Sequence, residues 1–256
     1  MSEPIRLGGM ALENGVLVHG PTHWACAVRR ADGELEVASG RKPIRSGELG
    51  AGLLRGPLKL AETFALLPLV RRELPEARLP YERPAVLAAV AASALTARGI
   101  RGTELAPVLQ EALAGLLAVA PAAAAVRGSS VAEYHGAEHI SIGTHEHGEP
   151  REREHERCGS HLVAPLLVTS LVGSLAARAA PPQLRALARA GAALGALASS
   201  VELFGWMVRN EDHPVARALS RPGHELQRRL LTADPTAEQL EVAEAALAEC
   251  LRLEAA

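Results

Sequence analysis

Histidines gather in one polar stretch of an otherwise apolar chain, residues 129–160. His135 and His139 lie four positions apart, slightly more than one helical turn, so a helix would place both imidazoles on one face, where they could share a metal ion. Glu138 completes the pattern His-x-x-Glu-His. This is the order of the inverted zincin motif, in which the histidines bind zinc and the glutamate deprotonates a metal-bound water. The alternative is a polar helix end with solvated histidines.

Three more side chains are candidate ligands. His155 and Cys158 lie three positions apart, and imidazole and thiolate are ligands that zinc prefers, although iron and copper also accept them. Cys158 could instead be a buried structural thiol. Glu202 lies in an apolar stretch, where a carboxylate must be paired, bind a metal or face water. We therefore predict a divalent transition metal, most simply zinc, with Glu138 as general base and ligands drawn from His135, His139, His155, Cys158 and Glu202.

The elements that must position these groups are expected to be mainly helical. Hydrophobic residues make up 48% of the 256 residues but aromatics only 2%, so alanine and leucine must fill the core, which favours closely packed helices. Residues 8–40 predict strands, including a hairpin around Asp32-Gly33. The predicted fold is mainly α (α+β): an N-terminal β segment over residues 1–46, then a helical metal-binding domain over residues 47–256 built as a bundle of Ala/Leu-rich helices.

Local signals predict where helices begin and end. Ser130 and Glu133 form a capping-box pattern that predicts a helix from Val131, followed by a polar loop over residues 141–157. Thr236 and Gln239 form a second such pattern before a C-terminal amphipathic helix. Residues 47–127 are expected to be helical from near Pro57, with breaks at the later prolines Pro68, Pro75, Pro80, Pro84, Pro107 and Pro121. Helices are also expected over residues 162–179 and 183–210, the second approaching a partner helix through the small residues Gly191, Gly195 and Ser199.

Charge and cysteine content limit the function classes. The formal net charge is −2 and the arginines are scattered, which excludes a basic nucleic-acid-binding face. Three distant cysteines and an N-terminus without an apolar run predict an intracellular protein in a reducing compartment. Residues 186–208 are long enough to span a membrane but contain Arg189 and Glu202, and three other apolar stretches are shorter. Cytoplasmic and inner-membrane locations both stay open, as does the oligomeric state.

The same motifs resemble those of the YqhQ family. The segments that carry the resemblance occur in the family's order over nearly the whole chain: GGMALENGVLVHGPTHWACAVRRADGELE, LLRGPLKLAETF, YHGAEHISIGTHEHGEP with HERCGSH, SVELFGW and RPGHELQRRLLTADPTAEQLEVAEAAL. The resemblance implies a metal-dependent enzyme with several membrane-spanning helices, and it implies site residues at His135, Glu138, His139, His155, Cys158 and Glu202. Two positions depart from the family pattern: Asn14 replaces a glutamate and His19 replaces an arginine. If those family residues contact substrate, this chain either acts on a different substrate or does not act.

Three functions remain open from the sequence. The first is a metal-dependent enzyme, most simply a hydrolase, acting on an unknown substrate. The second is a structural or sensory metal-binding protein with four closed ligands. The third is a membrane scaffold or transport component that uses Glu202 as an ion site. The number of protein ligands separates the first two, because a catalytic site keeps one position open.

Overall fold

The N-terminal part of the chain folds into an antiparallel meander. The computed structural model describes residues 5–44 and 55–256. Within these, the strands pair in chain order: β1 (Gly8–Ala11), β2 (Gly15–His19), β3 (His23–Arg29) and β4 (Leu35–Arg41). The turn between β3 and β4 contains Asp32 and Gly33, with Gly33 at φ 88°, as the hairpin prediction required. The predicted N-terminal β segment is thus confirmed.

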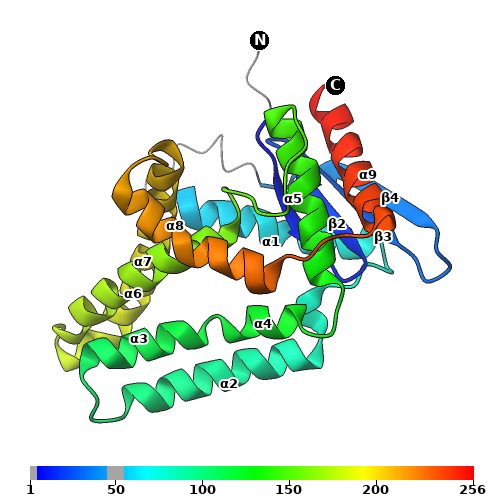
Figure 1. Cartoon of the computed structure of the whole chain (residues 1–256). Coiled ribbons are helices and arrows are strands. Elements are labelled where there is room, and N and C mark those ends of the chain that lie inside the picture. Colours follow the sequence, from blue (N-terminus) through cyan, green and yellow to red (C-terminus); the bar gives the residue numbers. More distant parts are fainter. Residues whose placement is uncertain (1–4, 45–54) are drawn as a thin grey trace.

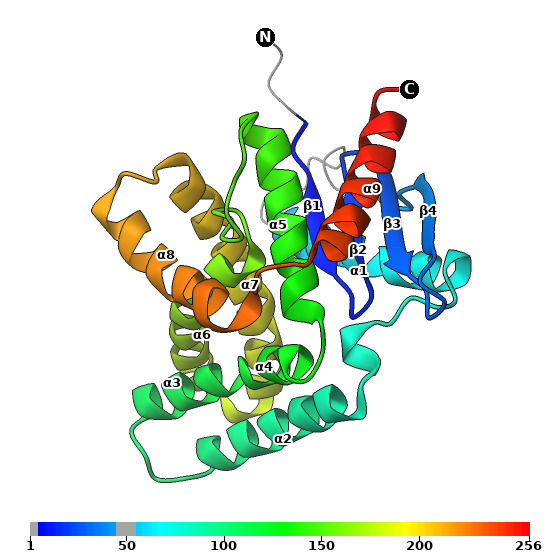
Figure 2. The same cartoon turned by 45° about the vertical axis from the view of Figure 1, so that its right-hand side comes forward.

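The described residues also form nine α-helices, which together with the sheet make the predicted mainly α fold. They are α1 (Arg55–Glu73), α2 (Pro84–Arg101), α3 (Pro107–Leu117), α4 (Ala120–Val126), α5 (Val131–His147), α6 (Val163–Arg178), α7 (Arg185–Arg209), α8 (Pro214–Leu226) and α9 (Ala237–Glu254). Short 3₁₀ turns lie at Pro80–Glu82, Gly159–Leu162 and Pro182–Leu184, and a π-helical turn follows α8 at Gln227–Leu231. The helix pair α6 and α7 and the layer of α2, α3 and α4 extend away from the sheet (Figures 1 and 2).

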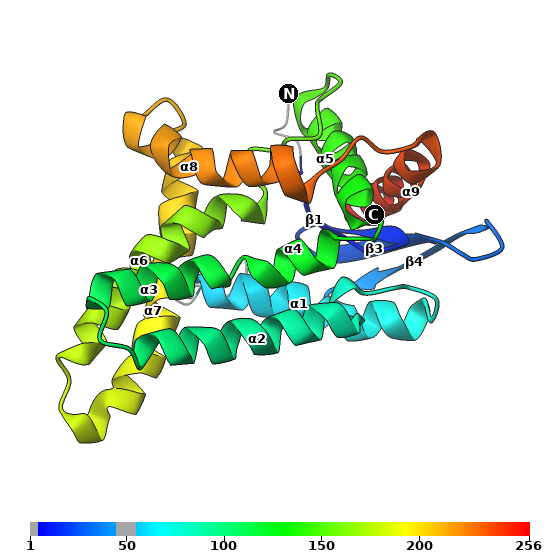
Figure 3. The same cartoon turned by 60° about the horizontal axis from the view of Figure 1, so that its bottom comes forward.

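Helices cover both faces of the sheet (Figure 3). On one face Val16, Val18 and Ala25 pack against α5 and α9, where α9 contributes Val242, Ala243 and Ala246. On the other face Leu17, Cys26 and Val28 pack against α1. The helix contributes Leu66 and Val70, and Leu74 follows directly after it. Alternate strand residues point to opposite faces, so each strand supplies both cores. The small alanines of α9 let this helix lie close to the strands.

The capping signals have different outcomes. At α9 the box forms as predicted: Gln239 N–H donates to Thr236 Oγ1 and the Gln239 side chain accepts from Thr236 N–H. At α5 the helix begins at Val131 as predicted, but the Ser130 side chain makes no capping bond. Instead Val131 N–H lies 3.4 Å from the Ser129 hydroxyl oxygen. The sequence therefore located the start of α5 but not the group that caps it.

Three local predictions were wrong. Residues 141–147 continue α5 instead of opening the loop, and the helix ends where Gly148 takes a left-handed conformation, φ 72°. Pro68 lies inside α1 without ending it. Gly191 and Gly195 face open space; the close contact between α6 and α7 is made at Gly173, against Ala192. Small residues allow close approach, but they do not by themselves select which face is used.

Three described segments are long and apolar enough to cross a membrane. They are Pro107–Val126, Gly159–Arg178 and Pro182–Arg209, and between 17% and 22% of each apolar window is buried within the protein. Large apolar side chains such as Leu116, Val172 and Leu187 are more than 60% exposed along them. Exposed apolar surface on this scale is typical of a membrane or protein interface, so these helices are compatible with membrane association.

Candidate metal centre

Helix α5 supplies two of the groups in the candidate site. His135 and His139 project from one face of α5, and their ring centroids are 4.3 Å apart. Cys158 comes from the segment that returns toward α5 and begins the 3₁₀ turn at Gly159–Leu162. One ligand atom from each of His135, His139 and Cys158 lies within 4.8 Å of the others. Of the predicted candidate ligands, the structure thus brings Cys158 together with His135 and His139.

The separation of the Cys158 and His135 ligand atoms fits a tetrahedral ion. The Cys158 sulfur lies 3.6 Å from His135 Nε2. A zinc ion bound at about 2.3 Å from sulfur and about 2.0–2.1 Å from nitrogen, with tetrahedral angles, places the two ligand atoms about 3.5 Å apart. The two ligands therefore already stand at the separation that such an ion would impose.

Backbone carbonyls fix the orientation of both imidazoles. His135 Nδ1–H donates to the carbonyl oxygen of Leu231 at 2.9 Å, and His139 Nδ1–H donates to that of Arg153 at 2.6 Å. Each Nε2 is then left with its lone pair, the form that binds a metal. Burial lowers the pKa of His139, against opposing contacts to Cys158, so this imidazole stays neutral near pH 7. Metal-binding histidines in proteins are usually held in this way.

Gly136 makes one of these carbonyl contacts possible. A methyl group on Gly136 would collide with the carbonyl oxygen of Ala233, because residues 231–233 pass directly beside α5. Ala233 N–H donates to the Ala132 carbonyl at 2.9 Å, which holds that segment in place. The same close passage brings Leu231 to His135. The glycine within His-x-x-Glu-His thus has a positional role that the motif alone does not reveal.

Glu138 is buried beside the cluster with one oxygen unpaired. It is 6% exposed, its side chain packs against Gly9 of β1, and among the described contacts its Oε2 has no hydrogen-bond partner. Burial raises the pKa of Glu138, while charge on His135 and His155 would lower it. A buried carboxylate oxygen without a partner is costly and calls for a bound group or a proton.

His155 lies next to the cluster but is bound elsewhere. Its ring centroid is 5.4 Å from that of His139, yet its Nε2–H donates to Glu146 Oε2 at 3.2 Å. Glu146 is also paired with Arg157. Burial alone would raise the pKa of Glu146, but the hydrogen bonds from His155 and Arg157 outweigh it and hold the pKa below its usual range. The group whose ligand atoms lie within 4.8 Å of one another therefore contains three residues, without His155.

Glu202 and the two positions that depart from the family pattern lie in other surroundings. Glu202 is exposed on α7 and is not part of the three-residue group. The Asn14 amide donates to the carbonyls of Arg29 and Glu76 and accepts from Arg78 N–H, so it fastens the β1–β2 turn to a neighbouring loop. His19 is half-buried against the ion pair of Lys42 and Glu62, with Lys42 Nζ 3.3 Å from its Nδ1. Asn14 thus has a structural role.

The sequence did not reveal the groups that orient the site. The carbonyl partners on Leu231 and Arg153, the His155 partner Glu146, and Gln227 all come from outside the predicted ligand set. Gln227 is fully buried; its Oε1 accepts from His155 N–H and its Nε2 donates to the His155 carbonyl and to Ser160 Oγ. The only sequence signal was that Glu146 lies between two histidines.

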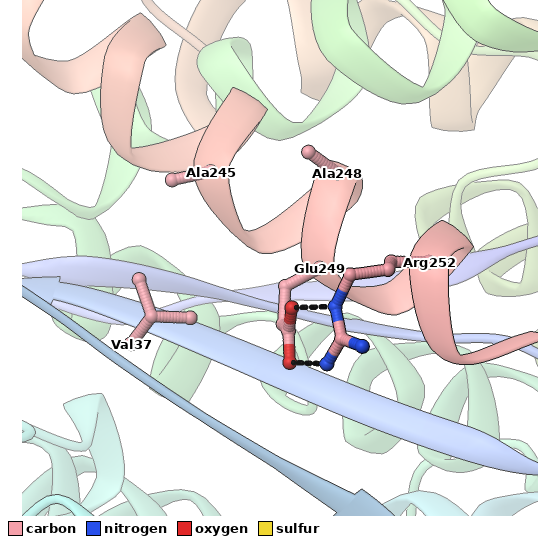
Figure 4. Close-up of a pocket in the computed structure, with 5 residues that line it drawn as sticks. All are labelled: Val37, Ala245, Ala248, Glu249 and Arg252. Carbon is pink, nitrogen blue, oxygen red and sulfur yellow. Dashed lines mark hydrogen bonds and ion pairs between the residues drawn. The ribbon is translucent and has the colours of Figure 1, made fainter.

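Two hollows on the surface differ in what they offer. One is a shallow depression between β4 and α9 (Figure 4), where Glu249 and Arg252 are paired with each other beside Val37 and Ala245. The other is a cavity of about 890 Å³ between residues 150–156, the end of α7 and α8. His155 and His161 form part of its wall, so this second cavity adjoins the candidate metal centre.

Comparison with known proteins identifies a family over the part of the chain that contains the candidate site. The family model described as "Protein of unknown function (DUF1385)" matches residues 123–253, just over half of the chain, which includes α5 to α9 apart from the last residue of α9. The chain is 34% identical over 133 residues to the "Uncharacterized protein YqhQ" of Bacillus subtilis (strain 168). That stretch covers 49% of this chain and 42% of the relative, so the chain matches less than half of the relative's length. No solved structure matches the chain.

Proposed function

We propose that this chain, which belongs to the DUF1385 family and is similar to YqhQ, is a metal-dependent enzyme whose centre is formed by His135, His139 and Cys158. The observation that carries the proposal is the convergence of these three ligand atoms within 4.8 Å, with both imidazoles oriented by backbone carbonyls. A set of two imidazoles and one thiolate suits zinc, and three protein ligands leave one position open, as in catalytic zinc sites. When bound, such an ion polarises a carbonyl or phosphoryl oxygen or activates a water.

Glu138 is the group in this chain that is suited to take the proton from that water. It lies on the same helix as both imidazoles and is buried. Its Oε2 has no hydrogen-bond partner among the described contacts, which leaves that oxygen available to accept a proton. A positioned base of this kind contributes roughly 10²–10⁴-fold to a rate. The simplest reaction is therefore hydrolysis.

Metal analysis of purified protein tests this proposal. We expect about one equivalent of zinc or a related metal in the wild-type chain, and loss of it in His135→Ala and in His139→Ala. His147→Ala is a matched control, since His147 lies on the same helix, is partly exposed and pairs with Glu156. Retention of metal in both ligand variants would rule out the centre.

A structural metal site is the second candidate, favoured by the nearness of His155. A rotation of its imidazole away from Glu146 would give a fourth ligand and close the site, as in metal-stabilised folds. His155→Ala separates the two functions. For the open catalytic site the variant keeps its metal, whereas for the closed structural site it loses metal and the melting temperature falls to that of chelator-treated protein.

The three apolar helices support a location at the inner membrane. Their apolar windows are mostly unburied within the protein, which a lipid environment would explain. The metal centre on α5 would then lie next to the membrane domain rather than within it, since α5 is not one of the three segments. Transport through an ion site at Glu202 has less support, because Glu202 is exposed and lies apart from the ligand group.

A further inference from the structure

The cavity beside the candidate metal centre has one strongly basic wall. Three arginines line the cavity: Arg217 and Arg221 of α8, and Arg228 of the π-helical turn that follows it. His224 of α8 lines the cavity as well. Positions 217, 221, 224 and 228 are separated by three or four residues, so one side of the helix presents all four side chains to the cavity. A row of this kind is a surface that recognises negative charge.

Two of these arginines have no carboxylate partner among the described ion pairs. Arg228 is paired with Glu225 at 2.9 Å, whereas Arg217 and Arg221 have no such pair in the described part of the chain. Across the cavity Glu156 pairs with His147 at 2.8 Å, and Glu154 lies 3.8 Å from Arg153. Two guanidinium groups are thus left available to bind an anion bidentately, the geometry that suits phosphate oxygens.

The other walls shape what can bind. Phe204, Met207 and Val208, from the last two turns of α7, give the cavity an apolar side. Glu152, in the segment between α5 and α6, also lines the cavity, and Glu211 lies just beyond the end of α7; neither forms a described ion pair. An anionic group would be repelled by these carboxylates and directed to α8, and an apolar portion would lie along α7. The arrangement fits an amphiphile rather than a bare ion.

The cavity is joined to the metal centre through buried hydrogen bonds. His155 is part of its wall, and the Gln227 amide holds the His155 main chain, Ser160 and the His161 ring in one network. His161 Nδ1–H in turn donates to the Ser220 carbonyl of α8 at 3.1 Å. The arginine-bearing helix and the segment that carries Cys158 are therefore fixed relative to each other, as a binding pocket and a reaction centre must be.

We propose that this cavity binds an amphiphile with a phosphate-type head, the head on Arg217 and Arg221 and the apolar portion against Phe204 and Met207. The role of this cavity as the substrate pocket of the enzyme rests on the proposed function. The cavity lies at the end of α7, one of the helices long enough to cross a membrane, so a phospholipid at the membrane surface could supply the phosphate-type head. A soluble phosphoester carries the same head.

Binding of octyl phosphate to the full chain, with metal content measured on the same samples, tests the proposal. We expect Arg217→Gln/Arg221→Gln to weaken binding at least about tenfold, because each lost charge-assisted bond contributes on that order. The control Arg209→Gln/Arg229→Gln removes the same charge from two exposed arginines outside the cavity wall and should leave binding unchanged. Inorganic phosphate should compete weakly, since it lacks the apolar portion.

The outcomes separate the alternatives. Equal binding to wild type and to Arg217→Gln/Arg221→Gln, or equally tight binding of octyltrimethylammonium, would overturn the proposal. Retention on phosphatidic acid vesicles but not on phosphatidylcholine vesicles, lost in that variant, would identify a lipid head as the source. Arginine-dependent octyl phosphate binding without vesicle retention would identify a soluble phosphoester. Binding of octyl phosphate to metal-free His135→Ala protein would show that the cavity binds its ligand without the metal. The binding proposal would then stand even if the enzyme proposal failed.

Discussion

At the scale of single residues, the role of Glu138 decides between a catalytic and a structural centre. Its buried, unpaired oxygen costs more stability in a charged carboxylate than in a neutral amide of the same shape. We expect Glu138→Gln to keep its metal and to melt at the same temperature or higher, while abolishing turnover of any substrate found for the wild type. Metal analysis, thermal unfolding and activity on the same preparation measure all three. Loss of metal in Glu138→Gln would instead make Glu138 a ligand.

His19 gives a residue-scale prediction that does not involve the metal. Burial, reinforced by the charge of Lys42 and opposed by that of Glu62, lowers the pKa of His19 to about 4 from the ordinary 6.5. Above pH 6.5 both the folded and the unfolded chain keep this imidazole neutral. As pH falls from 6.5 toward 4 only the unfolded chain takes up the proton, so the free energy of unfolding decreases, by on the order of 3 kcal/mol over the interval.

Urea unfolding at several pH values between 4 and 7 measures this contribution. His19→Asn removes the titrating group, so its unfolding free energy should fall less steeply with decreasing pH than that of the wild type. The effect of the substitution on stability at pH 7 is common to the whole series and cancels in the comparison of slopes. Parallel slopes for the two proteins would show that His19 is protonated equally in both states.

At the scale of helices and strands, sequence signals predicted the elements better than their contacts. The start of α5, the hairpin at Asp32-Gly33 and the capped start of α9 depend on neighbouring residues and were predicted. The extension of α5 past Ser141 was missed, because buried contacts on that helix outweigh the polar composition that suggested a loop. The pair His135 and His139 followed from helical spacing, whereas the bond of His155 to Glu146 depends on how a loop folds back.

Gly136 provides the element-scale test of how α5 is held. Gly136→Ala should displace residues 231–233 from α5, because the added methyl would collide with the Ala233 carbonyl. We expect a clear fall in melting temperature and weaker metal binding, since the Leu231 carbonyl would no longer hold His135. Gly191→Ala is the matched control within a helix. Nothing lies within 4 Å of the added methyl there, so it should stabilise the chain by about 0.5–1 kcal/mol through helix propensity alone.

The two glycine variants also test whether the motif or the packing positions His135. If Gly136→Ala binds metal as tightly as Gly191→Ala and melts at the same temperature, the passage of residues 231–233 beside α5 does not orient the imidazole. A shift confined to Gly136→Ala would show that the C-terminal third of the chain holds a ligand that lies near its middle. Such long-range contacts are what local sequence patterns do not encode.

At the scale of the whole molecule, the chain divides into a sheet with its covering helices and a group of exposed apolar helices. The sheet core is closed on both faces by α1, α5 and α9. By contrast, α3, α6 and α7 expose side chains such as Leu116, Val172 and Leu187. The candidate metal centre and the cavity lie where these two parts meet, on α5, α8 and the segment between α5 and α6. A site at that junction could act on a group presented at a membrane surface.

Membrane insertion of these helices is the prediction that this arrangement makes for the intact protein. Since about four-fifths of each apolar window is unburied, we expect the chain to sediment with membranes and to resist extraction by high salt and by alkaline carbonate, while detergent releases it. Replacing Val172 by lysine puts a charge on an exposed position of α6 and should lower the membrane-bound fraction, because a lysine at a bilayer centre costs about 2.5–3.5 kcal/mol. The control replaces Glu36, on β4 outside the three segments, by lysine and should leave that fraction unchanged. A wild-type chain that is released by salt alone and stays monodisperse without detergent would show that the apolar helices pack against another protein chain instead of lipid.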